Sequence, residues 1–192
     1  MPKNRQEVPL AERRTLIVDE ARRQFSDTGY RGTTVTSIAR ALNLTSAAIH
    51  WYFPTKDDLF AAAFAAIFQE ATTRVLSNTE SHGDPRGELI GVLEEMHPYK
   101  GLFREAYERM TSSPPLLGLY AEVMDWVDQR LIAAISHRAP DGDIALLADT
   151  AHVLLEGLLV SVRELDRPMA EMIDLLIDPL AAAAAARARK SR

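Results

Sequence analysis

Apolar residues recur with helical spacing along almost the whole chain. Ile17, Ala21 and Phe25 follow one another every four residues. Gly29, a residue suited to the left-handed end of a helix, closes a predicted first helix over 11–28. No stretch of alternating β-branched residues bounded by hairpin turns occurs in the sequence. The pattern therefore predicts an all-α protein.

Proline, glycine and polar clusters mark the breaks between about nine expected helices. Thr55 and Asp58 have the spacing of a capping box at the start of a long apolar helix. Pro179 should kink or end the last helix. The other helices are expected at about 35–42, 46–53, 86–97, 100–111, from Leu116 to the break at Pro140, 144–165 and from Ala170 onward.

The composition is typical of a folded globular protein: 192 residues, 47% hydrophobic and 26% charged. The absence of cysteine excludes disulfides, thiolate metal sites and cysteine nucleophiles. The first residues are charged, and no run of about 18 apolar residues is apparent. We therefore expect a cytoplasmic protein.

Charge is distributed unevenly along the chain. Residues 1–60 contain nine Lys or Arg against seven Asp or Glu, a net of +2, whereas residues 61–192 contain 13 against 20, a net of −7. This asymmetry suits a polyanion-contacting head on an acidic body. A difference of this size also arises in ordinary domains, so charge alone does not assign a function.

The segment TTVTSIARALNLTSAAIHWYFPTK, which begins at Thr33, meets the side-chain constraints of a helix-turn-helix. Ala39 is small where the second helix must approach closely. Four residues later, Asn43 occupies a turn position that needs positive φ, which Asn tolerates well. Ile49 points back into the small core. The constraints are met together, and they predict a DNA-binding head.

Four motifs follow one another over about residues 11–64: FSDTGY, GTTVTSIA, AIHWYF and PTKDDLF. Together they resemble the TetR family of transcriptional regulators. The rest of the chain is similar to that family in its length, its helical character and the EGLL stretch at 156–159. The resemblance implies a helix-turn-helix domain over 1–54 and a helical regulatory and dimerisation domain over 55–192.

The resemblance also implies function and partners. It predicts a homodimer that binds a palindromic operator in double-stranded DNA, with half-sites one helical turn apart. Repression is the usual sense in the family, with release by a small, largely apolar effector. The identity of the effector, the operator sequence and the direction of the ligand response are not encoded in any motif of the sequence.

Carried over residue by residue, the operator contacts of the family fall on Thr34, Thr45, Ser46, Ala47, Ala48, His50, Trp51, Tyr52 and Lys56. Thr34 and Thr45 place hydroxyls and amides at helix N-termini, which favour phosphate, and both also suit capping. His50 follows a core position, so its ring should face outward. Which of Trp51 and Tyr52 faces DNA is left open.

The recognition segment carries few positive charges. Many relatives have a basic residue where Ser46 stands, and none occurs here between Arg40 and Lys56. Phosphate attraction should therefore depend on cations elsewhere. These are Arg31, Arg40, Lys56 and the basic arm around Lys3, Arg5, Arg13 and Arg14.

Methionine and aromatic residues of the second domain are candidates for an effector pocket, since such side chains adapt to apolar ligands. Core packing is the more common role for any one of them. The candidates are Met96, Phe103, Tyr107, Met110, Tyr120, Met124 and Trp126, with His152 and Glu156 as a polar end.

The segment LLADTAHVLLEGLLVSV is apolar on most of its circumference, so a helix there needs burial on two sides. A four-helix bundle across a two-fold axis would provide that burial. The predicted dimer interface consists of Leu154, Leu158, Val162, Leu165, Leu175, Leu176 and Leu180.

The sequence also leaves two alternative functions open. Glu94-x-x-His97 and Asp149-x-x-His152 have the spacing found in di-iron helical bundles, but such a site needs two further carboxylates and leaves the head unexplained. No GxSxG, Walker or GxGxxG motif occurs, and we expect no metal, cofactor or enzymatic activity. A helical adaptor that binds only protein would show no affinity for DNA.

Overall fold

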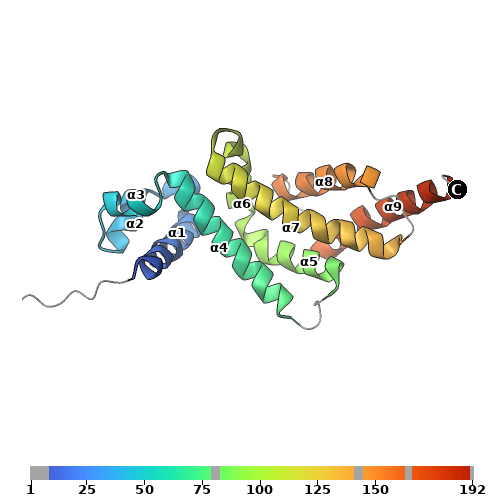
Figure 1. Ribbon diagram of the computed structural model, residues 1–192, viewed down its shortest axis with the longest axis horizontal. Coiled ribbons are helices and arrows are strands. Elements are labelled where there is room, and N and C mark those ends of the chain that lie inside the picture. Colours follow the sequence, from blue (N-terminus) through green and yellow to red (C-terminus); the bar gives the residue numbers. More distant parts are fainter. Residues whose placement is uncertain (1–8, 79–82, 141–144, 163–165, 191–192) are drawn as a thin grey trace, which may run out of the picture.

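The computed structural model describes residues 9–78, 83–140, 145–162 and 166–190. Within them the chain forms nine α-helices and two short 3-10 segments, with no strand, so the all-α prediction is confirmed. Figure 1 shows the helices of residues 10–52 gathered into a small head beside one end of the helix of residues 56–76, while the later helices form a larger body.

The head and its connection follow the predicted breaks to within a few residues. Gly29 (φ 70°) interrupts the first helix at its predicted end, and a further helical turn follows. Thr34, Thr45 and Thr55 each accept a hydrogen bond from a backbone amide three residues later, at 3.0–3.1 Å. The helices are α1 (Leu10–Gly32), α2 (Val35–Ala41), α3 (Ser46–Tyr52) and α4 (Lys56–Leu76).

The body consists of α5 (Pro85–Met96), α6 (Lys100–Arg109), α7 (Pro114–Arg138), α8 (Ala145–Val160) and α9 (Met169–Lys190). The α8 helix ends five residues before its predicted end at 165. The α9 helix continues through Pro179, so of the two predicted effects of this proline, a kink or an end, the end is wrong. Pro179 is exposed, and the alanine run after it has the highest helix propensity, which offsets the lost amide donor.

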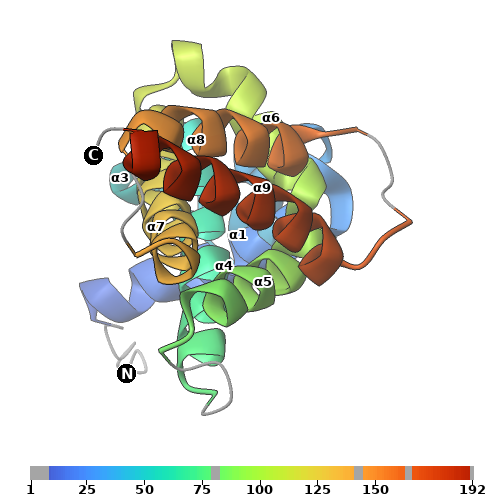
Figure 2. The ribbon, with the colours of Figure 1, turned by 90° about the vertical axis from the view of Figure 1, so that its right-hand side faces the viewer.

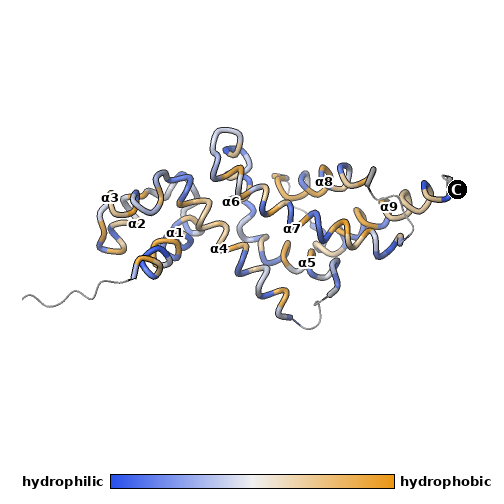
Figure 3. The backbone as a smooth tube through the Cα atoms, viewed as in Figure 1, coloured by the Kyte–Doolittle hydropathy of each residue, from blue (hydrophilic) through white to orange (hydrophobic). Residues whose placement is uncertain are grey.

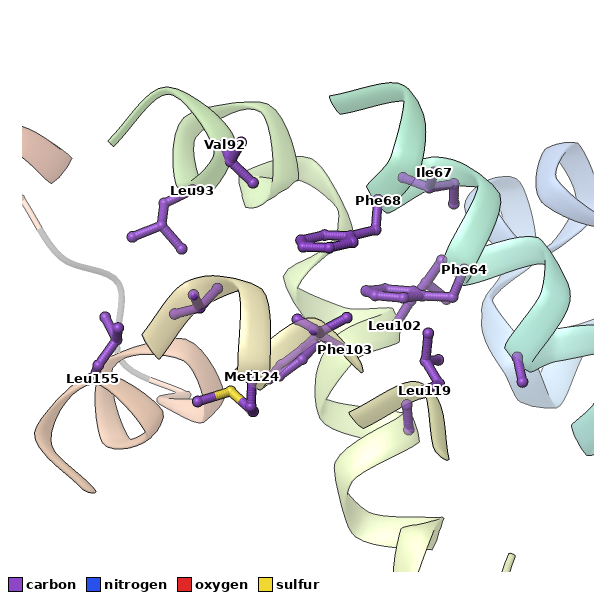
Figure 4. Packing of buried hydrophobic residues seen from close by; sticks show 14 of the residues in the cluster. Phe64, Ile67, Phe68, Val92, Leu93, Leu102, Phe103, Leu119, Met124 and Leu155 are labelled. Carbon is purple, nitrogen blue, oxygen red and sulfur yellow. The ribbon is translucent and has the colours of Figure 1, made fainter. Parts of the chain in front are cut away.

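The α4 helix is the central element of the fold. It packs against α1 at its start and against α5 and α7 farther along. Phe60 meets Phe25 edge-to-face at 4.8 Å between ring centres. Figure 4 shows Phe64 and Phe68 of α4 directed toward the α6 residue Phe103, and the Phe64 and Phe103 ring centres are 6.0 Å apart. One apolar core therefore runs from the head into the body.

One described helix, α4, is long and apolar enough by composition to span a membrane, with a mean hydropathy of 1.3 over its most apolar window. This differs from the sequence expectation, because its many alanines raise hydropathy without forming a bulky apolar run. Its phenylalanines are buried among other helices, as in the core helix of a globular domain. Figure 3 shows hydrophobic and hydrophilic positions interspersed along the helices of the body.

Candidate nucleic-acid interface

The turn between α2 and α3 has the predicted geometry. Asn43 has φ 54°, and the Leu44 amide donates to the Ala39 carbonyl at 2.8 Å. Ala39 is buried where α2 and α3 meet, and Ile38 and Ile49 are fully buried between the helices and the rest of the core. The α3 helix is thereby fixed at one end of the molecule, with its outer face in solvent (Figure 1).

The outer face of α3 carries small and aromatic side chains. Ala47, His50 and Trp51 are exposed, and Trp51 keeps 68% of its surface accessible. Tyr52 is half-buried and packs on the core, with its ring 4.7 Å from that of Trp51 in an edge-on arrangement. The ring that projects from the aromatic pair is therefore that of Trp51.

The other predicted contacts lie around the start of α2 and α3. Thr34 and Thr45 are exposed, and each hydroxyl oxygen caps its helix while its proton can still be donated. Ser46 and Ala48 are half-buried, and the Ser46 hydroxyl lies 3.2 Å from the Thr36 hydroxyl. The predicted DNA-contact set thus occupies one continuous part of the head, although its contact with DNA stays a prediction.

The His50 ring is oriented by the backbone. Its Nδ1 lies 3.0 Å from the carbonyl oxygen of Pro54, in the link between α3 and α4. A carbonyl oxygen accepts only, so Nδ1 must be the donor. The ring is thus held over the last turn of α3, with Nε2 as its other polar atom.

Lys56 is engaged inside the protein. Its ammonium donates to the Tyr30 carbonyl at 2.6 Å and lies 3.9 Å from the centre of the Tyr30 ring. Burial, together with the nearby positive charge of Arg109, lowers the pKa of Lys56. Its predicted phosphate contact remains a prediction.

The other described arginines expected to attract phosphate belong to α1 and α2. Arg40 is exposed in the last turn of α2, and Arg14 lies over the Phe53 ring at 5.0 Å from its centre. The Arg31 side chain is 87% exposed, with its Nε 4.0 Å from a Glu105 oxygen. Arg13 is half-buried. Lys3 and Arg5 lie outside the described residues.

A cluster of charged and aromatic groups joins the head to α6. The Tyr30 hydroxyl donates to Asp57 at 2.5 Å, and Arg109 donates to the same carboxylate at 3.1 Å. Burial favours the neutral acid, but hydrogen bonds from Tyr30 and Arg109 outweigh it and hold the pKa of Asp57 below its ordinary value. The sequence alone gives no sign of this cluster, because Tyr30, Asp57 and Arg109 are distant along the chain.

The body contains a cavity of about 360 Å³ among α4 to α9. This volume is within the range for small-molecule sites, about 300–1,000 Å³. Polar groups at its margin come from Glu94, His97, Lys100, Ser161 and Arg167. Most of the remaining lining is apolar and includes Phe68, Met96, Phe103, Leu158, Leu159 and Met172.

Two of the predicted pocket residues, Met96 and Phe103, line this cavity. The other candidates, Glu156 among them, do not line it. The Tyr120 hydroxyl donates to Glu156 at 2.7 Å, and the Tyr107 ring lies against Tyr120. Met124 is in the core, and Trp126 packs edge-on against Phe68. Residues placed outside the cavity lining are Tyr107, Met110, Tyr120, Met124, Trp126 and His152.

The carboxylate and imidazole motifs do not form a metal centre. Glu94 and His97 lie at the cavity, while the His152 Nδ1 is 2.6 Å from an Asp128 oxygen. No group of three or more His, Asp or Glu side chains suited to a metal ion occurs within the described ranges. Glu94 and His97 are instead polar residues of the cavity lining.

The helices α8 and α9 lie side by side on one face of the body (Figure 2). Exposed apolar side chains on this face include Leu154, Val162 and Leu175 from the predicted interface and Val153, which was not predicted. Leu176 is half-buried, and Leu158 lines the cavity. Leu180 is 8% exposed and therefore belongs to the interior of the protomer. Leu165 is outside the described residues.

Leu180 was predicted at the dimer interface, but it is buried because of the face of α9 on which it lies. Leu180 shares a face of α9 with the buried residues Ile173, Ile177 and Ala184, which follow at intervals of three or four. Leu175 lies on another face and is exposed. A run of leucines alone does not indicate which of them faces solvent.

Comparison with known proteins matches residues 17–63 to the family model for bacterial regulatory proteins of the tetR family. An HTH-type transcriptional repressor of Mycobacterium tuberculosis is 37% identical over 87 residues, which are 45% of this chain and 42% of that protein. The regulator BetI of Agrobacterium fabrum is 25% identical over 159 residues, covering 77% and 75% of the two chains. The chain spans 42% and 25% of the first two curated relatives.

Solved structures share the whole fold. A regulator from Saccharomonospora viridis in complex with choline has a TM-score of 0.65 at 23% identity, over 88% of this chain and 95% of that one. A regulator from Pseudomonas aeruginosa PAO1 has a TM-score of 0.67 at 18% identity, over 94% and 96%. The likeness extends from the head through the body.

Proposed function

Because residues 17–63 match the family model for bacterial regulatory proteins of the tetR family, we propose that the chain belongs to this family. We further propose that it is a repressor in the cytoplasm that binds a palindromic operator as a homodimer. The observation that carries this proposal is the outer face of α3. Ala47, His50 and Trp51 are exposed on one side of α3. The other side is held in place by the buried Ile49 and by the turn at Asn43. A recognition helix in a major groove needs such a face.

We propose that the second copy binds on the α8–α9 face. Val153 and Leu154 of α8 and Leu175 of α9 are between 52% and 63% exposed, which is unusual for large apolar residues gathered on adjacent helices. A two-fold axis there would pair the face with itself. The two heads would then be held at a fixed spacing, as a palindromic operator requires.

The cavity is the proposed effector site. Its apolar walls favour a small molecule with substantial hydrocarbon surface, and its charged margin can fix one polar group. The choline in the Saccharomonospora viridis structure belongs to that protein. For this chain, Phe68, Phe103 and Glu94 could accept an organic cation, whereas Lys100 and Arg167 could accept an acidic group.

The α6 helix connects the proposed effector site to the head. Its first turns contribute Lys100 and Phe103 to the cavity, and its last turn contributes Arg109 to the cluster with Tyr30 and Asp57. We propose that an effector shifts α6 and thereby the angle of the head. The change in operator affinity equals the difference in effector affinity between the two arrangements.

The decisive experiment selects operator sequences from random duplexes with the purified full-length protein. The expected product is a palindrome, and its affinity should fall steeply with added salt because phosphate contacts release counterions. Effector binding is then tested by titrating choline and a medium-chain carboxylate into the complex. If the protein binds no DNA duplex even at low salt, the proposal is contradicted and the alternative of a protein-binding adaptor is favoured.

The dimer face has its own test. Leu154→Glu should give monomers by light scattering and weaken operator binding, because each monomer presents only one head. Leu117→Glu is the matched control, since Leu117 is 51% exposed on α7 and is not part of the α8–α9 face. An unchanged dimer in the Leu154 variant would remove this face from the proposal.

A further inference from the structure

His50 has a ring whose proton position is fixed by the fold. Its Nδ1 hydrogen is donated to the Pro54 carbonyl at 3.0 Å, so the neutral ring carries only a lone pair on Nε2. In that state the outward nitrogen can accept a hydrogen bond but cannot donate one. A phosphate group of DNA offers oxygens that accept only. The neutral ring is therefore mismatched to phosphate.

We propose that His50 is a proton-linked phosphate-binding residue, whose Nε2 takes up a proton when the head docks on DNA. This inference rests on the proposed operator binding. In the docked state Nδ1 still donates to Pro54, and the new Nε2 hydrogen is donated to a phosphate oxygen. One proton from solvent is bound for each docked head, and no covalent bond changes.

The position of His50 favours phosphate over a base edge. It lies in the last turn of α3, and its ring is held toward the link to α4. Recognition helices read bases mainly with their N-terminal residues, a position that Ala47 and Ala48 occupy here. The carbonyl end of a helix also stabilises a cation. His50, at the C-terminal end of the recognition helix, is therefore better positioned to contact a DNA phosphate than a base.

The charged groups of the α3–α4 link region are Lys56, Asp57 and Asp58 at the start of α4, and Arg14 of α1 lies over the Phe53 ring at the end of α3. Arg40 is in the last turn of α2. Both carboxylates are already engaged: Asp57 accepts from Tyr30 and Arg109, and Asp58 caps α4 with Thr55. The phosphate brought by DNA is therefore the anion expected to stabilise the imidazolium.

Proton uptake makes operator affinity depend on pH. When the ring is neutral in the free protein and each head takes up one proton on binding, operator affinity falls by at most about tenfold per head for each unit rise in pH. For a dimer with two heads the limit is about a hundredfold. Because phosphate contacts ignore sequence, a duplex of unrelated sequence should show a loss in the same direction.

The test measures the dissociation constant of the full-length protein for a selected duplex from pH 6 to 8.5 at constant ionic strength. Calorimetry in two buffers of different ionisation enthalpy counts the protons bound. The wild type should lose affinity as pH rises and should take up protons. His50→Lys, which is cationic throughout, should retain affinity at pH 8.5 and lose most of the slope.

The controls separate this inference from other titrations. His50→Gln should bind more weakly at pH 6 and show little slope, whereas His137→Gln, at the exposed end of α7, should keep the wild-type slope. A wild-type slope in His50→Gln would overturn the inference, and so would a wild-type affinity that does not change with pH. Absence of duplex binding at every pH would instead overturn the proposed function.

Discussion

The guanidinium of Arg109, at the end of α6, lies 4.3 Å from the centre of the Tyr30 ring in α1. The same arginine donates to Asp57, which also accepts from the Tyr30 hydroxyl. The head is thus attached to the body by a stacked cation and a shared carboxylate. This contact links the proposed effector site to the proposed DNA-binding surface.

Arg109→Gln should weaken that link. We expect the effector-induced change in operator affinity to shrink by about fivefold, because a coupling network of this kind carries about 1 kcal/mol. The measurement is operator affinity with and without effector. Glu108→Gln, an exposed change on the same helix, is the control. Unaltered coupling in the Arg109 variant would show that α6 communicates with the head by another route.

Alkaline pH should destabilise the junction through Tyr30. Burial, with the hydrogen bond to Asp57, raises the pKa of Tyr30 to about 12. The folded state therefore holds the phenol proton more tightly than the unfolded chain, whose tyrosine pKa is about 10. This stabilisation is complete below about pH 10 and is lost as pH rises toward 12.

Urea unfolding of the wild type and Tyr30→Phe tests this sign. The stability advantage of the wild type should decrease between pH 9 and 11.5, by about 1 kcal/mol after allowance for solvent screening. The Phe variant controls for the other tyrosines, whose titration is common to both proteins. An advantage that grows with pH would contradict the assigned direction.

Trp51 and Ile49 are neighbours with opposite expected roles. Trp51→Ala should change the free energy of unfolding by less than about 0.5 kcal/mol, because the ring is exposed. It should weaken operator binding by about tenfold, the effect of about 1.4 kcal/mol. Ile49→Ala should cost about 2–4 kcal/mol of stability, because Ile49 is fully buried. Chemical denaturation and operator titration of both variants separate folding from binding.

Asn43 tests the turn geometry. Its φ of 54° strains most side chains, so Asn43→Ala should cost about 1 kcal/mol, and Asn43→Gly should cost little. For a chain of this size the alanine change should lower Tm by about 2–4 °C. Equal melting temperatures for the two variants would show that the backbone relaxes out of this conformation.

Local features of the sequence predicted the head well. The caps at Thr34, Thr45 and Thr55 and the break at Gly29 each depend on residues within one turn of the chain. The helix-turn-helix is similarly local, since its constraints at Ala39, Asn43 and Ile49 operate over ten residues. Such features can be derived without the tertiary fold.

The cavity and the junction required the tertiary fold. Met124 follows the cavity residue Val123, yet one step along a helix turns a side chain by about 100°, and Met124 enters the core instead. Lys56 meets Tyr30 across 26 residues of sequence. Only the packing of the helices decides which side chains line the cavity and which cations remain at the surface.

The edge-to-face contact between Phe25 and Phe60 has a consequence for engineering. Phe60 belongs to α4, so the head completes its interior with a residue beyond position 54. A fragment ending at 54 would expose the Phe25 ring to water and should fold poorly. Regulators with new DNA specificity are therefore better made by grafting the outward residues of α2 and α3 than by fusing excised heads to foreign bodies.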